Sequence, residues 1–451
     1  MTWTLDRLAQ ALRPLAGSSQ PLPVGTRAVR GISTDSRSIT DGDVFVALRG
    51  ERFDAHDFLV EAVRLGAAAL VVSDARRAAG LGVPAFVVPD TTAALGALGS
   101  WWRRAWGGTV IAVAGSNGKT TTREMIRASL SSVLEVHASR GNFNNQVGVP
   151  LTLLAIPGSA QAAVIEIGTN QPGEVELLRR IVEPDVAVVT SIGEEHLEGL
   201  GSVDGVLREE AAVFRGASLA VVPASQPEIG VAARASAGMV LEAGLDGGVH
   251  PDRWGLMPDG RGWAEFGAVR LELRIRGLHN LRNAMLAMAV ARACGVPDEA
   301  AARALSAQEP LDMRGQWLEA GSLTIINDAY NANPASMREA IALLDALGPG
   351  RPRVVILGSM RELGPQAPAL HEEIAARAVA SGANLVAGIG DFAAPLAAHA
   401  GADRVVTAPD VPELWSALST RLPRNAVVLL KASRGVRLER MVSLLTEWST
   451  A

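Results

Sequence analysis

The residues with the clearest chemical potential form a glycine-rich turn, Gly115-Ser116-Asn117-Gly118-Lys119-Thr120-Thr121. The turn follows the apolar run 109–114 and opens a stretch of helical character. At such a junction successive backbone N–H groups point at a bound anion, and glycines let the backbone approach phosphate closely. Lys119 would then reach the β- and γ-phosphates, and the Thr120 hydroxyl would coordinate Mg²⁺. The glycine spacing is shorter than in the usual phosphate loop, but the Lys-Thr-Thr segment favours nucleotide binding over an ordinary turn.

Lysine is almost absent from the sequence, because Lys119 and Lys431 are the only two lysines among 42 Lys and Arg residues. A chain that uses arginine for most cations would retain lysine where a compact ammonium is required. Lys431 follows the apolar run 427–430, and the only tyrosine, Tyr330, lies in a polar segment after the run 323–326. Both segments could present polar groups to a ligand from the ends of strands. A plain turn is the alternative for each.

Two potential metal ligands also follow apolar runs. Glu166 ends the run AAVIE, and His196 comes shortly after VAVVT. Ligands of open α/β sheets bind beyond the carboxyl ends of the strands, and a carboxylate beside a phosphate loop is a suitable Mg²⁺ ligand. The alternatives are a capping or turn-stabilising role for Glu166 and a structural role for His196.

Amide side chains gather at two places. Asn142, Asn144 and Asn145 precede an apolar helix, where groups that both donate and accept suit a sugar- or peptide-bearing ligand. A capped, solvated loop is the alternative. Asn280 and Asn283 are three residues apart, share one helix face and could read an adenine edge, although Asn280 could equally be a helix N-cap.

The elements that must position these residues are apolar β-branched runs alternating with Ala- and Leu-rich helical stretches, a pattern typical of parallel α/β sheets. We expect an α/β fold of three domains: an N-terminal α/β substrate domain over 1–88, a central phosphate-loop domain with a mainly parallel sheet over 89–310, and a C-terminal Rossmann-like domain over 311–451. The expected elements include helices at 91–106 and 277–293, strands at 109–114, 163–167 and 186–190, and a hairpin within 262–275.

Composition excludes several classes of protein. The 451 residues are 48% hydrophobic and 20% charged, as in a soluble globular protein, and the net charge of −5 argues against a nucleic-acid-binding surface. The single cysteine excludes an internal disulfide and a cysteine-cluster metal site. No apolar run approaches the roughly 20 residues that span a bilayer, and the N-terminus is unlike a secretory signal. We therefore expect a cytoplasmic protein, a monomer, with no nucleic-acid partner and no membrane span.

Together these motifs resemble the Mur ligases, the cytoplasmic enzymes that add amino acids to the peptidoglycan precursor, and the resemblance covers nearly the whole chain. The loop GSNGKTTT resembles the family's phosphate loop, including its short glycine spacing. The segment YNANP resembles the branch that adds D-alanyl-D-alanine to UDP-N-acetylmuramoyl-tripeptide. The resemblance implies amide-bond formation through an acyl phosphate, with ATP and Mg²⁺ as cofactors and ADP and phosphate as products.

The resemblance also implies roles for individual residues. The catalytic residues would be Lys119, His196, Lys431 and Arg434. The nucleotide would contact residues 115–121 together with Asn280, Asn283, Arg314 and Asp328. The UDP-sugar, peptide and dipeptide would contact Ser33, Asp35, Ser36, Arg37, Asn142, Asn144, Asn145, Tyr330, Asn331 and Asn333. Mg²⁺ would be held by Thr120, Glu166, His196 and Glu210.

One position departs from the family pattern. Mur ligases usually carry a lysine shortly after the metal-binding histidine, modified to a carbamate that helps to hold a second Mg²⁺. Here Glu210 occupies that position. Because both groups end in a carboxylate, Glu210 or its neighbour Glu209 could be a metal ligand, directly or through water. The alternative is a site without the second metal, in which Glu210 is a solvated helix residue.

Other functions remain open at this point. A sibling ligase that adds a diamino acid, or the folate glutamate-chain ligase, would share the phosphate loop, but the YNANP segment weighs against both. A phosphoryl-transferring kinase or a nucleotide switch would need no clusters from a third domain. A third possibility is an inactive scaffold protein that has lost catalysis, and the only feature of the sequence that favours it is Glu210. The third residue of the acceptor peptide, lysine or diaminopimelate, does not follow from the residues.

Overall fold

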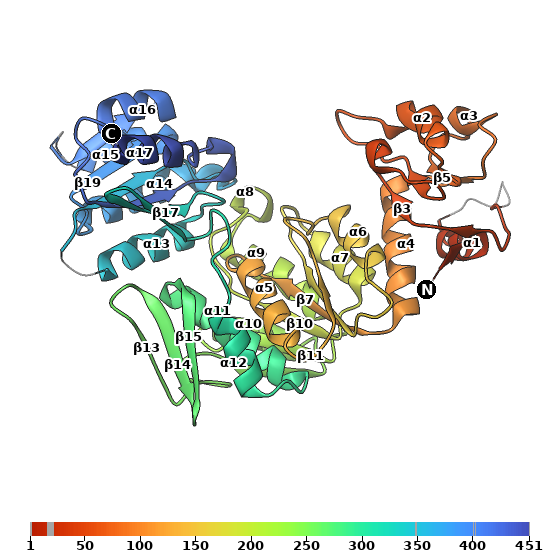
Figure 1. The fold of residues 1–451 in the computed structure, drawn as a ribbon, viewed down its shortest axis with the longest axis horizontal. Coiled ribbons are helices and arrows are strands. Elements are labelled where there is room, and N and C mark those ends of the chain that lie inside the picture. The colour runs from red at the N-terminus through yellow and green to blue at the C-terminus, as the bar shows by residue number, and fades with distance from the viewer. Residues whose placement is uncertain (1, 16–21, 348–349, 400, 402, 451) are drawn as a thin grey trace. The chain divides into compact units, whose positions relative to one another are not determined.

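The computed structural model describes residues 2–15, 22–347, 350–399, 401 and 403–450 (Figure 1). The chain divides into two compact units. The first comprises Met1–Ala112, Leu134–Gly168 and Glu174–Asp185, and the second comprises Val113–Val133, Thr169–Gly173 and Val186–Ala451. No helix in the described ranges is long and apolar enough to cross a bilayer.

The N-terminal region, in the first unit, contains a four-stranded parallel sheet with the order β3-β4-β5-β6. Its strands are β3 (Ile32–Ser33), β4 (Val44–Val46), β5 (Ala69–Val72) and β6 (Ala85–Val87), and β1 (Trp3–Thr4) pairs antiparallel with β2 (Ala28–Val29). The helices are α1 (Leu5–Leu12), α2 (Leu59–Arg64), α3 (Ala75–Ala78) and α4 (Thr91–Trp106). Val44 and Val46 pack on one face of β4 and Phe45 on the other, as in parallel sheets that are buried on both sides.

The central region contains a six-stranded sheet with the order β12-β11-β10-β7-β9-β8. Its strands are β7 (Thr109–Ala114), β8 (Val136–Ala138), β9 (Ala162–Glu166), β10 (Val186–Val189), β11 (Leu219–Pro223) and β12 (Met239–Ala243). The helices are α5 (Lys119–Leu130), α6 (Gly148–Leu154), α7 (Glu174–Val182), α8 (Leu197–Leu200), α9 (Val203–Glu210) and α10 (Pro227–Arg234). Because β7 and β10 are neighbours, the turn after β7 meets the segment after β10.

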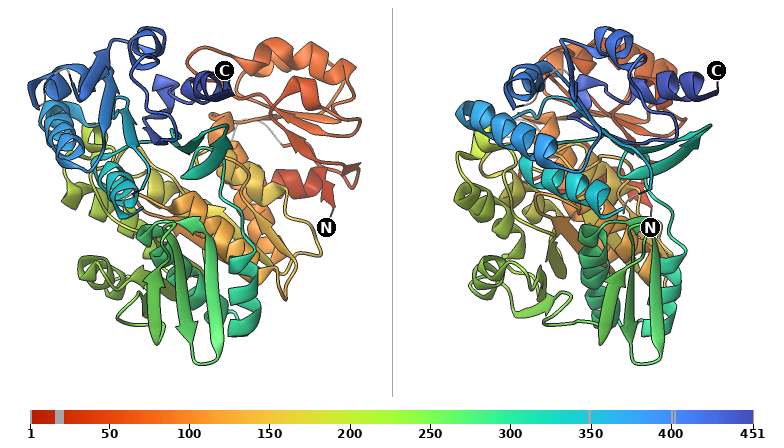
Figure 2. Two further views of the ribbon diagram at one scale, coloured as in Figure 1. Left: turned by 60° about the vertical axis from the view of Figure 1, so that its left-hand side comes forward. Right: turned by 90° about the vertical axis from the view of Figure 1, so that its left-hand side faces the viewer.

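A small antiparallel sheet follows, formed by β13 (Arg253–Leu256), β14 (Arg261–Phe266) and β15 (Val269–Arg276). It packs against α11 (Leu278–Ala293) and α12 (Asp298–Ser306) (Figure 2). The predicted hairpin is therefore β14–β15, and β13 extends it by a third strand. Buried and more exposed side chains alternate along β14 and β15, which is typical of a sheet with one buried face.

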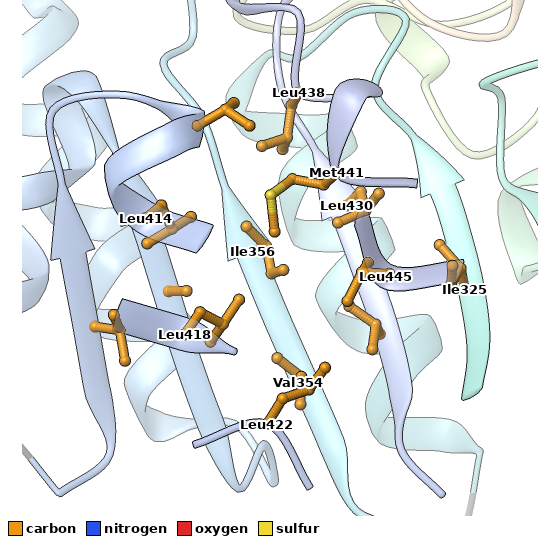
Figure 3. Close-up of a cluster of buried hydrophobic side chains, with 14 of the residues drawn as sticks. Ile325, Val354, Ile356, Leu414, Leu418, Leu422, Leu430, Leu438, Met441 and Leu445 are labelled. Atoms are coloured by element: carbon orange, nitrogen blue, oxygen red, sulfur yellow. The ribbon is translucent and has the colours of Figure 1, made fainter. Parts of the chain in front are cut away.

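The C-terminal region contains a six-stranded sheet with the order β16-β17-β21-β18-β19-β20, in which only β16 runs antiparallel. Its strands are β16 (Gln316–Ala320), β17 (Leu323–Asp328), β18 (Arg353–Leu357), β19 (Leu385–Ile389), β20 (Val405–Ala408) and β21 (Val427–Lys431). The helices are α13 (Pro334–Ala346), α14 (Ala367–Ala380), α15 (Ala393–His399), α16 (Val411–Leu418) and α17 (Arg440–Thr450). On one face, Ile356 and Leu430 pack against Leu414 of α16 and Met441 of α17 (Figure 3).

Most predicted elements are present with nearly the predicted bounds. The helix 91–106 and the strand 109–114 coincide with α4 and β7. Between β4 and β5 the chain forms a 3₁₀ turn, Ala55–Phe58, followed by the short α2. Strands β11, β12 and β20 were not predicted: β12 is only half-buried and lies at the sheet edge, so it lacks the continuous apolar run of an inner strand.

Candidate active site

The predicted phosphate loop lies between β7 and α5, as expected. Gly115 and Gly118 have φ values of +117° and +83°, which side chains with a Cβ rarely adopt. An added Cβ would also lie 2.5 Å from Thr190 Oγ1 at Gly115 and 2.8 Å from Asn283 Oδ1 at Gly118. The two glycines are therefore required by both backbone conformation and close packing.

Residues that follow β10 hold the loop in place. The Gly193 N–H donates to Ser116 Oγ at 3.0 Å, and the Asn117 N–H donates to Ser191 Oγ at 3.1 Å. Thr120 is buried in the first turn of α5, with Thr121 beside it. The loop thus has a rigid support before any phosphate binds.

Lys119 folds back over its own loop. Its Nζ donates to the Gly115 carbonyl at 2.6 Å and to the Ser116 carbonyl at 3.3 Å, and lies 3.5 Å from Glu195 Oε1. The ammonium is therefore at the loop where β- and γ-phosphates are expected, although phosphate oxygens would have to replace some of these partners.

His196 lies between two carboxylates. Its Nε2 is 2.9 Å from Glu195 Oε1, and its Nδ1 forms an ion pair with Glu362 Oε2. Burial lowers the pKa of His196, but the hydrogen bonds to Glu195 and Glu362 outweigh it and raise that pKa to about 9. Although burial raises the pKa of Glu195, Lys119 and His196 lower it overall. In this arrangement the imidazole is a cation, and its role as a metal ligand remains a prediction.

Glu195 was not predicted as a site residue. Its side chain is 7% exposed, and its Oε2 has no hydrogen-bond partner among the described residues. The sequence signal was a carboxylate directly before the predicted metal-binding histidine, at the carboxyl end of a strand. Burial and contact with Lys119 give this carboxylate its importance, and neither is visible in the local sequence.

Glu210 is buried, with 1% of its surface exposed, so the alternative of a solvated helix residue is wrong. Its Oε2 accepts a hydrogen bond from the Gly115 N–H at 2.8 Å. Burial raises the pKa of Glu210 to about 7. The neighbouring Glu209 instead accepts from the Gly173 N–H at 2.7 Å. Glu210 therefore contacts the phosphate loop, and whether it also binds metal remains a prediction.

Asn280 and Asn283 lie on one face of α11, as predicted, and both are buried. Asn280 is not the N-cap, because Gly277 occupies that position. The Asn280 amide donates to the Arg276 carbonyl at 2.7 Å, and Asn283 Nδ2 donates to Asn280 Oδ1 at 3.3 Å. Since Asn283 also approaches Gly118, this pair lies beside the phosphate loop, where the nucleotide is expected.

Lys431 and Asp328 face each other across adjacent strands, β21 and β17, where the two residues are in register. Lys431 is 3% exposed, and its Nζ lies 2.8 Å from Asp328 Oδ2 and donates to the Asn331 carbonyl at 2.8 Å. Asp328 Oδ1 accepts from the Gly315 N–H at 3.1 Å. The second lysine is therefore tied to the polar segment that was predicted to contact the ligand.

The remaining predicted residues of the C-terminal region lie around this ion pair. The Arg314 guanidinium stacks 3.9 Å from the centre of the Tyr330 ring. Arg434 is 58% exposed, with Nη1 2.9 Å from Met313 Sδ. Arg434 Nη1 also lies 3.5 Å from Glu439 Oε1, and the contact of both cations with an anionic ligand remains a prediction.

Asn333 joins the C-terminal polar segment to the phosphate loop. It is the N-cap of α13, and its Nδ2 donates to Asn117 Oδ1 at 2.9 Å. A cavity of about 130 Å³ lies beside this contact. It is lined by Glu195, His196, Asn331, Ala332, Asn333, Arg361, Glu362, Ser433, Arg434 and Gly435. The structure thus brings predicted residues from the central and C-terminal regions of the second unit to one cavity.

The predicted residues of the first unit form two local groups. Asn144 Nδ2 donates to Glu166 Oε1 at 3.0 Å, so the amide loop and the predicted metal ligand are in contact. Asn145 Oδ1 accepts from the Gly148 N–H at 2.9 Å and thus stabilises the start of α6, while Asn142 is exposed. Asn145 therefore stabilises its own loop, and its role toward the substrate remains a prediction.

The second group is the turn Ser33–Arg37. The Asp35 side chain caps the 3₁₀ turn Ser36–Ser38 and pairs with Arg37 at 2.7 Å, while Ser33 Oγ donates to the Asp35 carbonyl. The hydrogen bond from Arg37 lowers the pKa of Asp35 to about 2. This preorganised turn is half-buried apart from the exposed Arg37, and its role toward the uridine remains a prediction.

A phosphate loop after a central parallel strand, faced by buried polar groups of a Rossmann-like domain, defines a nucleotide-dependent enzyme of the α/β class. Three families match this chain: the Mur ligase family catalytic domain over residues 28–100, the Mur ligase middle domain over 113–291 and the Mur ligase glutamate ligase domain over 313–434. The chain belongs to the Mur ligase family, as the sequence motifs predicted.

Individual relatives match along their full length. The UDP-N-acetylmuramoyl-tripeptide–D-alanyl-D-alanine ligase of Bacillus subtilis (strain 168) is 34% identical over 429 residues, which cover 93% of each chain. The enzyme of the same name from Escherichia coli (strain K12) is 33% identical, covering 93% of this chain and 94% of that one.

Solved structures agree with this assignment. The crystal structure of MurF from Acinetobacter baumannii has a TM-score of 0.90 and 31% identity, covering 99% of both chains. That of the MurF ligase from Thermotoga maritima in complex with ADP has a TM-score of 0.83 and 28% identity, covering 94% of this chain and 98% of that one. The expected three-domain α/β fold class and the use of ATP are confirmed.

Proposed function

We propose that this chain joins D-alanyl-D-alanine to UDP-N-acetylmuramoyl-tripeptide in peptidoglycan precursor synthesis, with conversion of ATP to ADP and phosphate. The full-length similarity to ligases of that name carries the proposal. The local geometry is consistent with it, because Asn333 of the YNANP segment contacts Asn117 of the phosphate loop. A nucleotide switch would not require this contact.

The chemistry needs an activated carboxylate, because a free carboxylate is a poor electrophile for an amine. An oxygen of the tripeptide carboxylate forms a bond to the γ-phosphorus of ATP while the bond to the ADP oxygen breaks. The amine of D-alanyl-D-alanine then attacks the acyl carbon, loses a proton and expels phosphate through a tetrahedral intermediate. Lys119 offsets the charge that develops on the phosphoryl oxygens, the main requirement of such transfers.

The C-terminal residues would shield this intermediate from water. Lys431 and Arg434 contribute cations beside Asn331, and Asn333 links their segment to the phosphate loop. Exclusion of water matters because an acyl phosphate is readily hydrolysed, and domain closure is a common way to achieve it.

The residues present fit a divalent cation. Glu195 Oε2 is a buried carboxylate oxygen that no described residue binds, and Thr120 is at the helix start where a hydroxyl ligand is expected. Glu166, at the end of β9, remains a metal ligand predicted from the family resemblance. When bound, Mg²⁺ would polarise the phosphoryl oxygens and offset their charge.

Phosphate release is the decisive assay. It should require ATP, the UDP-linked tripeptide and D-alanyl-D-alanine together, and mass spectrometry should identify the pentapeptide. Release that proceeds with a hydroxyl acceptor, or without any amine, would instead identify a kinase or a nucleotide switch. Parallel reactions with lysine- and diaminopimelate-containing tripeptides determine which third residue the enzyme accepts.

We further propose that the protein is cytoplasmic, because the reaction consumes ATP, and that it is a monomer. Sedimentation equilibrium with and without nucleotide tests the monomer, and a concentration-dependent mass of two chains would contradict it.

A further inference from the structure

One carboxylate oxygen of Glu195 is buried and has no hydrogen-bond partner in the described part of the chain. Oε1 is close to His196 Nε2 and Lys119 Nζ, at 2.9 and 3.5 Å, whereas Oε2 has no partner. A buried polar atom without a partner destabilises the folded state, and a charged one does so more strongly. A ligand that binds Oε2 would remove this destabilisation.

A cavity with room for a hydrated ion lies beside Glu195. Glu195 lines the cavity of about 130 Å³, well above the volume of one water molecule. It also contacts Lys119 of the phosphate loop. A cation at this carboxylate would therefore be beside the lysine that is expected to contact the phosphates of the nucleotide.

Glu210 is placed differently. Its Oε2 already accepts the Gly115 N–H at 2.8 Å, its side chain is almost completely enclosed, and it does not line this cavity. Its contact is with the first residue of the phosphate loop. This geometry suits a residue that holds the loop backbone in position.

We propose that Glu195, rather than Glu210, supplies a carboxylate oxygen to the divalent cation that accompanies the nucleotide. Glu210 is then a positioning residue for the phosphate loop. The proposal rests on the proposed ATP-dependent function. In the described ranges no three His, Cys, Asp or Glu side chains gather in a metal-binding group. Phosphate oxygens and water would therefore complete the shell, which is the usual mode for Mg²⁺.

Direct binding of Mn²⁺, measured by electron paramagnetic resonance in the presence of ADP, tests the division of roles. Glu195→Gln should weaken Mn²⁺ binding by about tenfold or more, whereas Glu210→Gln should keep it within about threefold, because its amide oxygen can still accept the Gly115 N–H. Glu198→Gln is the matched control, since it removes the same charge from an exposed position on the adjacent α8 and should leave Mn²⁺ binding unchanged.

Binding of ADP in EDTA shows whether each variant keeps an intact phosphate loop. Unchanged Mn²⁺ binding in Glu195→Gln, or an equal loss in Glu210→Gln, overturns the proposal. If Glu195→Gln does not fold, Glu195→Asp replaces it, because withdrawal of the oxygen by one methylene must still weaken Mn²⁺ binding. These measurements need no acceptor peptide, so failure of the proposed ligase reaction would appear separately, in the phosphate-release assay.

Discussion

Replacement of Glu210 by glutamine should stabilise the protein more at pH 8 than at pH 5. Burial raises the pKa of the folded Glu210 carboxyl from 4.5 to about 7, so the folded protein retains a proton that the unfolded chain releases more readily. The free energy of unfolding therefore falls as the pH rises from the unfolded pKa through the folded pKa. At about 1.4 kcal/mol per pH unit, the free energy of unfolding falls by about 3 kcal/mol as the pH rises past both pKa values. Between pH 5 and pH 8 it falls by about 2 kcal/mol.

Thermal unfolding of the nucleotide-free protein in EDTA measures this effect. Because glutamine does not titrate, the difference in midpoint between the variant and the wild type should grow by about 2 °C from pH 5 to pH 8 in a chain of 451 residues. Glu176→Gln is the control: burial raises the pKa of Glu176, but Arg179 and Arg180 outweigh it and lower that pKa to about 2, so its contribution should stay constant over this range. A Glu210→Gln difference that is equally constant would refute the raised pKa.

Three further substitutions test the nucleotide side of the site. Lys119→Ala should abolish phosphate release, and near-normal ADP formation in that variant would remove the phosphate-loop assignment. Lys431→Arg should lower both turnover and stability, the latter by about 1–3 kcal/mol, because a larger guanidinium must fit a site that is 3% exposed beside Asp328. Kinetics and melting like those of the wild type would show that Lys431 has no special role at the end of β21. Gly118→Ala should weaken ADP binding in calorimetry, since φ is +83° and the added Cβ would lie 2.8 Å from Asn283 Oδ1, and an unchanged affinity would show that the loop tolerates a side chain.

The sequence predicts a site best where the required groups are contiguous. The strand, glycines, lysine and helix of residues 109–130 stand in one uninterrupted stretch, so both the element and its chemistry could be recognised. The proximity of Lys431 and Asp328 was also accessible, because both end apolar runs and the carboxyl ends of parallel strands share one sheet edge.

Contacts between distant segments could not be predicted in this way. Glu195 becomes a site residue through its burial and its approach to Lys119, and Glu210 through its hydrogen bond to Gly115. The ion pair between His196 and Glu362 likewise depends on the packing of the central and C-terminal regions of the second unit. Local sequence shows that these side chains are charged but not which partners enclose them.

The near-absence of lysine gives the protein an unusual spectroscopic simplicity. Both lysines are largely enclosed, Lys119 at 13% and Lys431 at 3% side-chain exposure. Protein made with isotope-labelled lysine would give side-chain signals from only two ammonium groups, one at the phosphate loop and one beside Asp328. Each signal would report directly on its own side of the site during nucleotide binding, without the crowded background that surface lysines produce in most proteins of this size.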